Sequence, residues 1–215
     1  MIAAEANGKP INHHSVHAPA GTVFVVDGDP QARDAHESLV RSVGLPVESF
    51  SSAHEFLAAF TPDRSGCLVL DVRLPGMSGL ELQEQLNTLG ADLPVIVVSA
   101  NGDVPTVVRA MRSGAFDFLS KPFDPQSLLE RIQEAVTKAA EQNEVRTLRA
   151  QVAARWATLS VREQQVADLL VDGKTTKEIA SSLSISPKTV DNHRAKLLEK
   201  MRAENPVVLR KLLFP

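Results

Sequence analysis

Short apolar runs alternate with stretches of helical periodicity along residues 21–138. Five short segments are predicted to be strands: residues 22–26, 47–50, 67–70, 95–98 and 116–119. The stretches between and after them predict helices over residues 30–43, from Ser52, from Ser78, over residues 104–112 and from Pro125. Regular alternation of strands and helices predicts a parallel sheet covered on both faces, and right-handed crossovers make that sheet doubly wound.

The same spacing predicts which side of a helix faces the sheet. The apolar stripes are Ala32, Ala35, Leu39 and Val43 in the first helix and Leu82, Leu86 and Leu89 in the helix after Ser78. Ser-x-x-Glu sequences at residues 52–55 and 78–81 predict capping boxes. Gly114 is expected to end the helix over residues 104–112.

The connector that follows has the composition of one long helix. Residues 124–157 contain no Gly and, after Pro125, no Pro, and they are rich in Ala, Glu, Gln and Arg. Val145, Leu148 and Val152 are spaced by three and four, as in a coiled coil. We expect the last helix of the sheet domain to continue as a rigid linker whose stripe either packs on a domain surface or self-associates.

The C-terminal segment predicts a compact bundle of four short helices. Capping boxes at residues 160–163 and 175–178, Ser186-Pro187 and Asn205-Pro206 mark the four helix starts. The inward positions are Val166, Leu169, Leu170, Ile179, Ala180, Leu183, Val190, Leu197 and Met201. The brief turn at Ser184-Ile185 joins the middle pair, which reads as a helix-turn-helix.

Composition narrows the class of protein. The 215 residues include one cysteine, Cys67, which excludes an internal disulfide framework and a cysteine-cluster zinc site. No apolar run approaches the ~20 residues that cross a bilayer, so no membrane partner is expected. Residues 1–20 show neither a signal peptide nor a period, and we expect a cytoplasmic protein with a disordered N-terminal tail.

The formal net charge of −3 hides an asymmetry between the two halves. Residues 21–138 hold 16 acidic and 9 basic residues, whereas residues 139–215 hold 9 acidic and 13 basic residues. An acidic half suits a metal ion or a cationic partner, and a basic half suits a polyanion. The charge pattern therefore indicates two tasks in one chain.

Polar side chains fall at the ends of four predicted strands. Asp27, Asp71 and Ser99 each follow a strand directly, and Lys121 lies just beyond a fourth. Because ligands bind outside the carboxyl ends of strands in open α/β sheets, these side chains are expected to converge. Grouped carboxylates favour Mg²⁺, and Asp71 can attack a phosphoryl group whose charge Lys121 and the metal neutralise. Phe118 is either plain strand core or an aromatic ring that moves with Ser99.

The third helix of the C-terminal bundle carries a polar outer face. Residues 174–211 hold nine basic and four acidic residues. Such a helix can lie in the major groove of DNA, with Lys and Arg on phosphates, although a solvated face has the same composition.

Four segments carry a family resemblance. VFVVDGDP, LVLDVRLPGMSGLEL, VIVVSANGD and AFDFLSKPF resemble, in order and spacing, a response-regulator receiver domain over about residues 21–140. The resemblance implies a flavodoxin-like fold in which Asp71 is the phosphoacceptor, phosphorylated by a sensor histidine kinase or a small phosphodonor. It further implies Mg²⁺ ligation by Asp27, Asp71 and the backbone carbonyl of Arg73, switch roles for Ser99 and Phe118, and phosphate binding by Lys121.

Gly28 departs from the receiver pattern, which has two adjacent acids after the first strand. Gly28 supplies no carboxylate, so either Asp29 or water substitutes as a ligand, or Mg²⁺ binding is weakened. The alternative function that follows is an atypical receiver, controlled by a partner or by constitutive dimerisation instead of phosphorylation.

The sequence LSVREQQVADLLVDGKTTKEIASSLSISPKTVDNHRAKLLEKM resembles the LuxR-type helix-turn-helix. The resemblance implies DNA contacts by Lys177, Lys188, Thr189, Asp191, Asn192, His193, Arg194, Lys196 and Lys200, with Lys177 and Lys200 on phosphates. Asp191 falls at a base-reading position, where a carboxylate can accept from a cytosine amino group. Members of this family bind inverted repeats as dimers, commonly through the last helix, here about residues 207–213.

Together the two halves resemble a response regulator of the FixJ/NarL type. The expected division is a tail (1–20), a receiver domain (21–138), a helical linker (139–157) and a LuxR-type domain (158–215). The implied partners are promoter DNA, a sensor histidine kinase, a second copy of the chain and RNA polymerase. No enzyme activity is expected beyond self-catalysed phosphoryl transfer to Asp71 and its reversal by autodephosphorylation. A Mg²⁺-dependent phosphohydrolase is disfavoured, because residue 73 is Arg where a general-acid Asp is needed and the strand-end loops are short.

Overall fold

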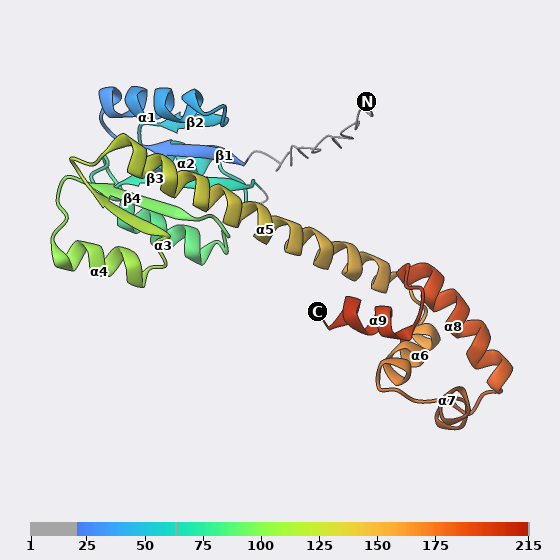
Figure 1. Ribbon diagram of the computed structural model, residues 1–215. Helices are drawn as coiled ribbons and strands as arrows, with labels where there is room; N and C mark the ends of the chain where they lie inside the picture. Colours follow the sequence, from blue (N-terminus) through green and yellow to red (C-terminus); the bar gives the residue numbers. More distant parts are fainter. Residues whose placement is uncertain (1–20, 63, 215) are drawn as a thin grey trace, which may run out of the picture. The chain divides into compact units, whose positions relative to one another are not determined.

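A five-stranded, wholly parallel sheet organises the N-terminal part of the chain (Figure 1). The computed structural model describes residues 21–62 and 64–214, so the predicted tail at residues 1–20 lies outside the described residues. The strands are β1 (Thr22–Val26), β2 (Val47–Phe50), β3 (Gly66–Asp71), β4 (Val95–Ser99) and β5 (Asp117–Ser120), in the order β2-β1-β3-β4-β5. The order reverses between β1 and β3, where an open α/β sheet has its binding crevice.

Helices cover both faces of the sheet, and alternate residues of each strand face one layer or the other. One layer is formed by α1 (Pro30–Ser42) and α5 (Pro125–Ala157), and the other by α2 (Ala53–Ala59), α3 (Gly79–Thr88) and α4 (Val104–Arg112). Phe24 and Val26 of β1 pack with α2, α3 and α4, whereas Val23 and Val25 pack with α1 and α5. Burial on both faces explains why the three central strands, β1, β3 and β4, are nearly continuous apolar runs without alternation. The doubly wound fold is therefore confirmed.

Several local predictions need correction. In α1 the buried residues are His36 and Val40, while Ala35 is exposed and Val43 is 39% exposed, so the predicted stripe is rotated by about one position. Leu89 is 58% exposed because α3 ends at Thr88. Strand β5 begins one residue later than predicted.

The capping boxes at Ser78, Ser160 and Thr175 form as predicted, with each Ser or Thr and its Glu bonding reciprocally. The predicted box at Ser52 forms only in part. Ser52 Oγ accepts from the Glu55 N–H, but the Glu55 carboxylate accepts from Ser51. The sequence therefore predicted each helix start correctly, but the bond from Glu55 back to Ser52 was wrong.

The chain divides into two compact units, one up to Asn143 and one from Glu144, and α5 runs through the boundary. In the second unit, α6 (Val161–Val171), α7 (Thr176–Leu183), α8 (Pro187–Met201) and α9 (Pro206–Leu213) surround one apolar cluster. Val166, Ile179, Val190, Leu197 and Met201 are fully buried in it, as the sequence predicted. Val152 of α5 joins this cluster, whereas Val145 and Leu148 remain about half exposed.

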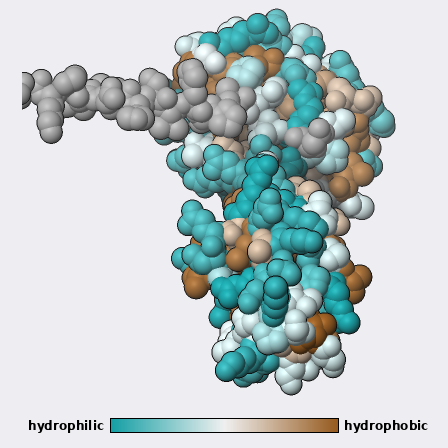
Figure 2. Space-filling model, turned by 90° about the vertical axis from the view of Figure 1, so that its right-hand side faces the viewer, coloured by the Kyte–Doolittle hydropathy of each residue, from teal (hydrophilic) through white to brown (hydrophobic). Residues whose placement is uncertain are grey.

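The face drawn in Figure 2 is mostly hydrophilic, with brown hydrophobic residues in small patches. Within residues 21–62 and 64–214, no helix combines the length and the apolar character needed to span a bilayer.

Candidate functional site

The side chains predicted to converge lie at one edge of the sheet. Asp27 follows β1, Asp71 is the last residue of β3, Ser99 ends β4, and Lys121 follows β5. Because β1 and β3 are neighbours and parallel, Asp27 and Asp71 stand side by side at the point where the strand order reverses. The structure therefore brings the two carboxylates and the lysine together.

Lys121 bridges the two carboxylates. Its Nζ donates to Asp27 Oδ2 and to Asp71 Oδ1, each at 2.9 Å. Asp27 is 2% exposed and Asp71 is 6% exposed, so the ammonium offsets two charges that burial would otherwise disfavour. Burial alone would lower the pKa of Lys121, but its hydrogen bonds to Asp27 and Asp71 and their charges outweigh burial and raise it.

Backbone donors hold the other two carboxylate oxygens. The Asp29 N–H donates to Asp27 Oδ1 at 2.9 Å, and the Arg73 N–H donates to Asp71 Oδ2 at 2.7 Å. The guanidinium of Arg33 on α1 donates to the Asp27 carbonyl at 2.7 Å. All four carboxylate oxygens therefore have a fixed donor, which holds both side chains in one orientation.

The donor set at this edge fits Mg²⁺ in part. Asp27, Asp71 and the Arg73 carbonyl are hard oxygen donors of the kind that Mg²⁺ prefers. A Cβ on Gly28 would lie 3.5 Å from the Arg73 carbonyl oxygen, so the missing acid would have stood beside this set. Asp29 is exposed and its Oδ1 accepts from the Gln31 N–H at 3.0 Å as the N-cap of α1.

Two carboxylates are therefore present where the receiver pattern has three. Among the described residues, no group of three or more His, Cys, Asp or Glu side chains could hold a metal ion. Of the substitutes considered from the sequence, Asp29 is engaged in capping, which leaves water or weaker binding.

The two predicted switch residues lie next to this edge in different settings. Ser99 is fully buried, and its hydroxyl both donates to the Asn101 carbonyl and accepts from the Asn101 N–H, each at 3.1 Å. Phe118 is partly buried and packs against the cluster under α2, α3 and α4. The loop before α4 passes close to β5, since a Cβ on Gly102 would lie 2.6 Å from Ser120 Oγ and 3.7 Å from Phe118.

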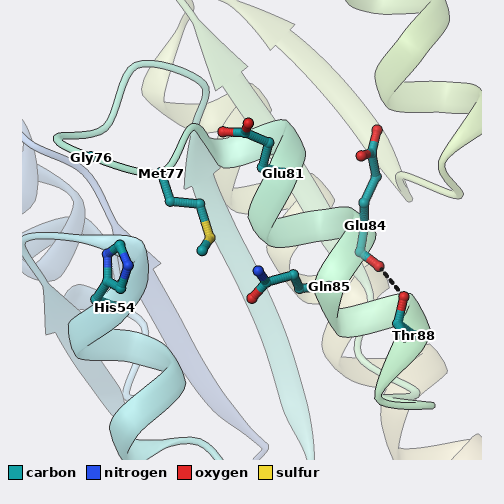
Figure 3. Close-up of a pocket in the computed structure, with 7 residues that line it drawn as sticks. All are labelled: His54, Gly76, Met77, Glu81, Glu84, Gln85 and Thr88. Carbon is teal, nitrogen blue, oxygen red and sulfur yellow. Dashed lines mark hydrogen bonds between the residues drawn. The ribbon is translucent and has the colours of Figure 1, made fainter.

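A separate hollow of about 470 Å³ lies nearby, and none of the predicted site residues lines it (Figure 3). His54 faces Met77 and the acidic side of α3 across it. Glu81 caps α3 through Ser78, and Glu84 pairs with Arg109 at 2.9 Å. Both carboxylates that line this hollow are therefore engaged, one in capping a helix and the other in an ion pair.

Sequence reasoning missed His36, which is buried on α1 and stacks on Phe123 at 6.1 Å. Its Nδ1 has no hydrogen-bond partner among the described residues. Burial lowers the pKa of His36, and the Asp27 carboxylate opposes that effect. The apolar stripe predicted for α1 did not include His36, so no signal in the sequence pointed to this residue.

In the second unit, α7 and α8 form a helix-turn-helix, with Ser184 at φ 54° in the turn and Ser186 capping α8. The predicted DNA-contacting residues of α8 that are exposed are Lys188, Asp191, Asn192, Lys196 and Lys200, while Thr189, His193 and Arg194 are half-buried. Thr176 Oγ1 on α7 lies 3.4 Å from Asp191 Oδ1, and Lys177 is exposed on the same helix. The whole predicted set lies on these two helices.

Lys200 has a different environment from the rest of the set. Its Nζ donates to Glu163 Oε2 at 2.7 Å and to the Thr158 carbonyl at 3.1 Å. Glu163 is 4% exposed, and Lys200, followed by the Ser160 N–H, lowers the pKa of its carboxyl to about 2. Lys200 thus ties α8 to the start of α6.

A parallel α/β unit with paired carboxylates and a lysine at its switch point, followed by a helix-turn-helix unit, defines the class of two-component response regulators. Comparison with known families agrees. Residues 23–133 match the response regulator receiver domain, and residues 157–212 match the luxR family of bacterial regulatory proteins. The chain belongs to this family of transcriptional regulators.

Individual relatives extend over almost the whole chain. It is 44% identical to the transcriptional regulatory protein FixJ of Azorhizobium caulinodans, covering 89% of this chain and 92% of the relative. It is 42% identical to nodulation protein W of Bradyrhizobium diazoefficiens, covering 89% and 85%. Among solved structures, the response regulator StyR is 42% identical with a TM-score of 0.83, covering 90% of this chain and 98% of that one. These names are of regulators, which favours regulation over the phosphohydrolase.

Proposed function

We propose that phosphorylation of Asp71 by a sensor histidine kinase controls the DNA binding of this protein. One observation carries the proposal: Asp71 ends β3 at the switch point, and its carboxylate is held by the ammonium that would stabilise a phosphoryl group. The functional division is the receiver domain at 21–138, the linker at 139–157 and the LuxR-type domain at 158–215. We propose a cytoplasmic location, because the protein must reach both its kinase and its promoter DNA.

Phosphoryl transfer uses this chain as nucleophile and the donor as phosphoryl source. An Asp71 carboxylate oxygen attacks phosphorus, the P–N bond of a phosphohistidine breaks, and the imidazole nitrogen leaves with a proton from solvent. Lys121 donates to the phosphoryl oxygens in place of Asp71 Oδ1 and limits the accumulation of negative charge. Hydrolysis of the acyl phosphate, which is autodephosphorylation, returns the carboxylate. Mg²⁺, when bound by Asp27, Asp71 and the Arg73 carbonyl, supplies further charge neutralisation.

The Gly28 position should weaken Mg²⁺ binding. Only two carboxylates are available, and Asp29 caps α1. The protein therefore requires a higher Mg²⁺ concentration for phosphorylation than a receiver with the full acidic pair. The alternative of a receiver without phosphate control rests on Gly28 alone, whereas Asp71, Ser99 and Lys121 all retain the groups that phosphate control uses.

Phosphorylation acts on a two-state element. The Ser99 hydroxyl, now bonded to Asn101, would turn to a phosphoryl oxygen, and Phe118 would repack beneath the loop that carries Gly102. That change alters the surface around residues 104–119 and favours a homodimer. A dimer matters because two helix-turn-helix units bind two half-sites together.

On DNA, α8 enters the major groove with Lys188, Asp191 and Asn192 toward base edges. The backbone-contact and flanking positions are Lys177, Thr189, His193, Arg194, Lys196 and Lys200. Lys200 can contact DNA only if its ammonium leaves the Glu163 carboxylate, so we expect it to contribute least to DNA binding among these residues. RNA polymerase is the further partner expected of a regulator bound at promoter DNA.

The test is intact mass after incubation with acetyl phosphate and Mg²⁺. Wild type should gain one phosphoryl group, and Asp71→Asn should gain none. Asp29→Asn serves as a matched control, since it removes an acid two residues from Asp27 and should keep the modification. A wild-type protein that stays unmodified at saturating Mg²⁺, or an Asp71→Asn variant that is still modified, would overturn the proposal.

A further inference from the structure

Gln83 on α3 is a buried polar side chain that lies outside both the carboxylate site and the helix-turn-helix. It is 1% exposed. Its Nε2 donates to the carbonyl oxygens of Ala110 and Ser113, each at 3.1 Å. Because both partners are acceptors, the amide nitrogen must face them, which fixes the orientation of the side chain. Gln83 therefore joins α3 to the C-terminal end of α4, across 27 and 30 residues of chain.

Two neighbours of Gln83 on α3 contact the same end of α4. Asn87, one turn further along, donates to the Ser113 carbonyl at 2.7 Å. The Glu84 carboxylate accepts from the Arg109 guanidinium at 3.1 Å and 2.9 Å. The Glu84–Arg109 pair is about half exposed, so it contributes less than the buried hydrogen bonds of Gln83. Together these side chains of α3 hold the last turn of α4.

The N-terminal half of α4 has no comparable attachment. Ala110 is the one buried residue of the helix and the one that joins the cluster under α2, α3 and α4. Val104 is 74% exposed and Val108 is 41% exposed. In the part of the chain that the structure describes, no hydrogen bond or ion pair joins residues 104–108 to another helix or strand, and Asp103 only caps the helix itself. Helix α4 is therefore fastened to the domain at its C-terminal end.

The glutamine at this position is kept at a cost in stability. Its Oε1 is buried and has no hydrogen-bond partner among the described residues. A buried acceptor without a donor destabilises the folded state, and an apolar side chain of the same size would avoid that penalty. Without Gln83, the carbonyls of Ala110 and Ser113 would still accept from the Ala115 N–H and from Asn87. Stability alone therefore does not explain Gln83, whose distinguishing property is the pair of hydrogen bonds onto α4.

We propose that Gln83 is a positioning residue, which holds the C-terminal end of α4 so that this helix tilts about that end when Asp71 is phosphorylated. The tilt rests on the proposed function, whereas the attachment by Gln83 does not. Ser99 precedes the loop that leads into the free end of α4, and Phe118 lies beside Gly102 in that loop. A change at Ser99 and Phe118 therefore displaces the first turn of α4, while Gln83 keeps the last turn in place.

Amide hydrogen exchange of the full-length protein, followed by NMR, measures the attachment of each end of α4. The first-turn amide is the N–H of Val107, which donates to the Asp103 carbonyl, and the last-turn amides are those of Ser113 and Ala115. Opening the last turn also breaks the hydrogen bonds to α3, and one hydrogen bond corresponds to about tenfold in an opening equilibrium. In wild type, the first-turn amide should therefore exchange at least about tenfold faster than the last-turn amides, after correction for intrinsic rates.

Gln83→Leu keeps the volume of the side chain and removes both of its hydrogen bonds. It should raise the exchange of the last-turn amides about tenfold or more, while the first-turn amide and the thermal midpoint stay nearly unchanged. Gln85→Leu is the matched control and should behave as wild type, because Gln85 is exposed on the same helix and its side chain has no hydrogen bond to a described residue. Asn87→Ala removes one bond at an exposed position and should raise the same exchange by a smaller factor, which keeps the test available if Gln83→Leu does not fold.

Two results for the unphosphorylated protein would overturn the role of Gln83. One is equal protection of the first-turn and last-turn amides in wild type. The other is a Gln83→Leu variant whose last turn keeps its wild-type protection.

A second arm adds acetyl phosphate and Mg²⁺, with phosphorylation checked by intact mass. Wild type should change the exchange of the first-turn amide and keep that of the last-turn amides, whereas Gln83→Leu should change both. Changes of equal size at both ends of phosphorylated wild type would overturn the tilt. Protein that takes up no phosphoryl group, or phosphorylated protein that changes at neither end, would overturn the proposed function and the tilt together, and the unphosphorylated proteins would decide the role of Gln83 independently.

Discussion

Replacing Gly28 with aspartate should tighten Mg²⁺ binding at the edge of the sheet. The added Cβ would lie 3.5 Å from the Arg73 carbonyl oxygen and 3.4 Å from Pro75 Cδ, which are ordinary van der Waals contacts. Gly28 does not use the left-handed backbone, so the new residue requires no strained φ. The extra carboxylate would join Asp27 and Asp71 beside the Arg73 carbonyl, which the receiver resemblance implies is a metal ligand.

The magnitude follows from charge at short range. Unit charges about 4 Å apart interact by about 4 kcal/mol at an effective dielectric constant of 20, and desolvation cancels much of that gain. A net gain of about 1.4–2.8 kcal/mol corresponds to roughly 10–100-fold tighter binding. Without Mg²⁺ the same carboxylate adds repulsion that the single ammonium of Lys121 must offset, so the metal-free variant should be less stable than wild type.

The assay is thermal unfolding over a Mg²⁺ titration for wild type, Gly28→Asp and Gly28→Asn. Gly28→Asn is the matched control, because it has the same shape as Gly28→Asp without the charge. A ligand that binds only the folded state stabilises it by about 2.7 kcal/mol at one hundred times its Kd. Gly28→Asp should therefore start below wild type and gain more from Mg²⁺, with its transition reached at lower concentration. Equal Mg²⁺ midpoints for all three proteins would refute the argument that residue 28 is a missing ligand.

Three further predictions concern the second unit. Glu163→Gln should lower the free energy of unfolding by about 1–2 kcal/mol at pH 7, because it removes the charge that Lys200 holds. The folded-state pKa of Glu163, about 2, lies below its ordinary value of 4.5, so the stabilisation by the Glu163 carboxylate is present above pH 4.5 and is lost as the pH falls toward 2. In urea unfolding, the difference in unfolding free energy between wild type and Glu163→Gln should therefore be smaller at pH 3 than at pH 7. Leu197→Ala should cost about 2–5 kcal/mol in the same assay, since Leu197 is fully buried, and a loss below 1 kcal/mol would contradict that packing. Asp191→Ala should relax base preference at one position of the DNA site by about 1–3 kcal/mol. Lys177→Ala should instead weaken binding to all sequences alike and reduce the salt slope by about one, and binding to a panel of single-base variants would show the difference.

Local signals in the sequence predicted the elements well. Helix α4 runs from Val104 to Arg112 as predicted, and the reciprocal bonds at Ser78 and Ser160 form because a capping box needs only residues three apart. The strand-end positions of Asp27 and Asp71 followed from the same local reading, since parallel strands bring their carboxyl ends to one edge.

Contacts between distant parts of the chain were harder to foresee. Lys121 lies 94 residues from Asp27 and 50 from Asp71, so the sequence indicated proximity without the double bridge. Lys200 pairs with Glu163 across 37 residues, and nothing local distinguishes it from a DNA-facing lysine.

The predicted inward face of α1 was wrong by about one position. His36 is inward on α1 although it is polar, because the sheet buries the side that also carries Val40. On α5 the stripe splits, with Val152 in the core and Val145 and Leu148 exposed. Periodicity defines a stripe to within about one residue, and tertiary packing selects the side.

The central claim is that the state of Asp71 sets DNA binding by the second unit, and fluorescence anisotropy with a promoter fragment containing an inverted repeat tests it most directly. The titration compares wild type with Asp71→Asn, each with and without acetyl phosphate at saturating Mg²⁺ and fixed salt. The account predicts that the phosphodonor tightens binding of wild type at least about tenfold, as coupling of about 1.4 kcal/mol requires, and leaves Asp71→Asn unchanged. Wild-type binding that is equally tight with and without the phosphodonor, in protein shown by mass to be phosphorylated, would contradict it.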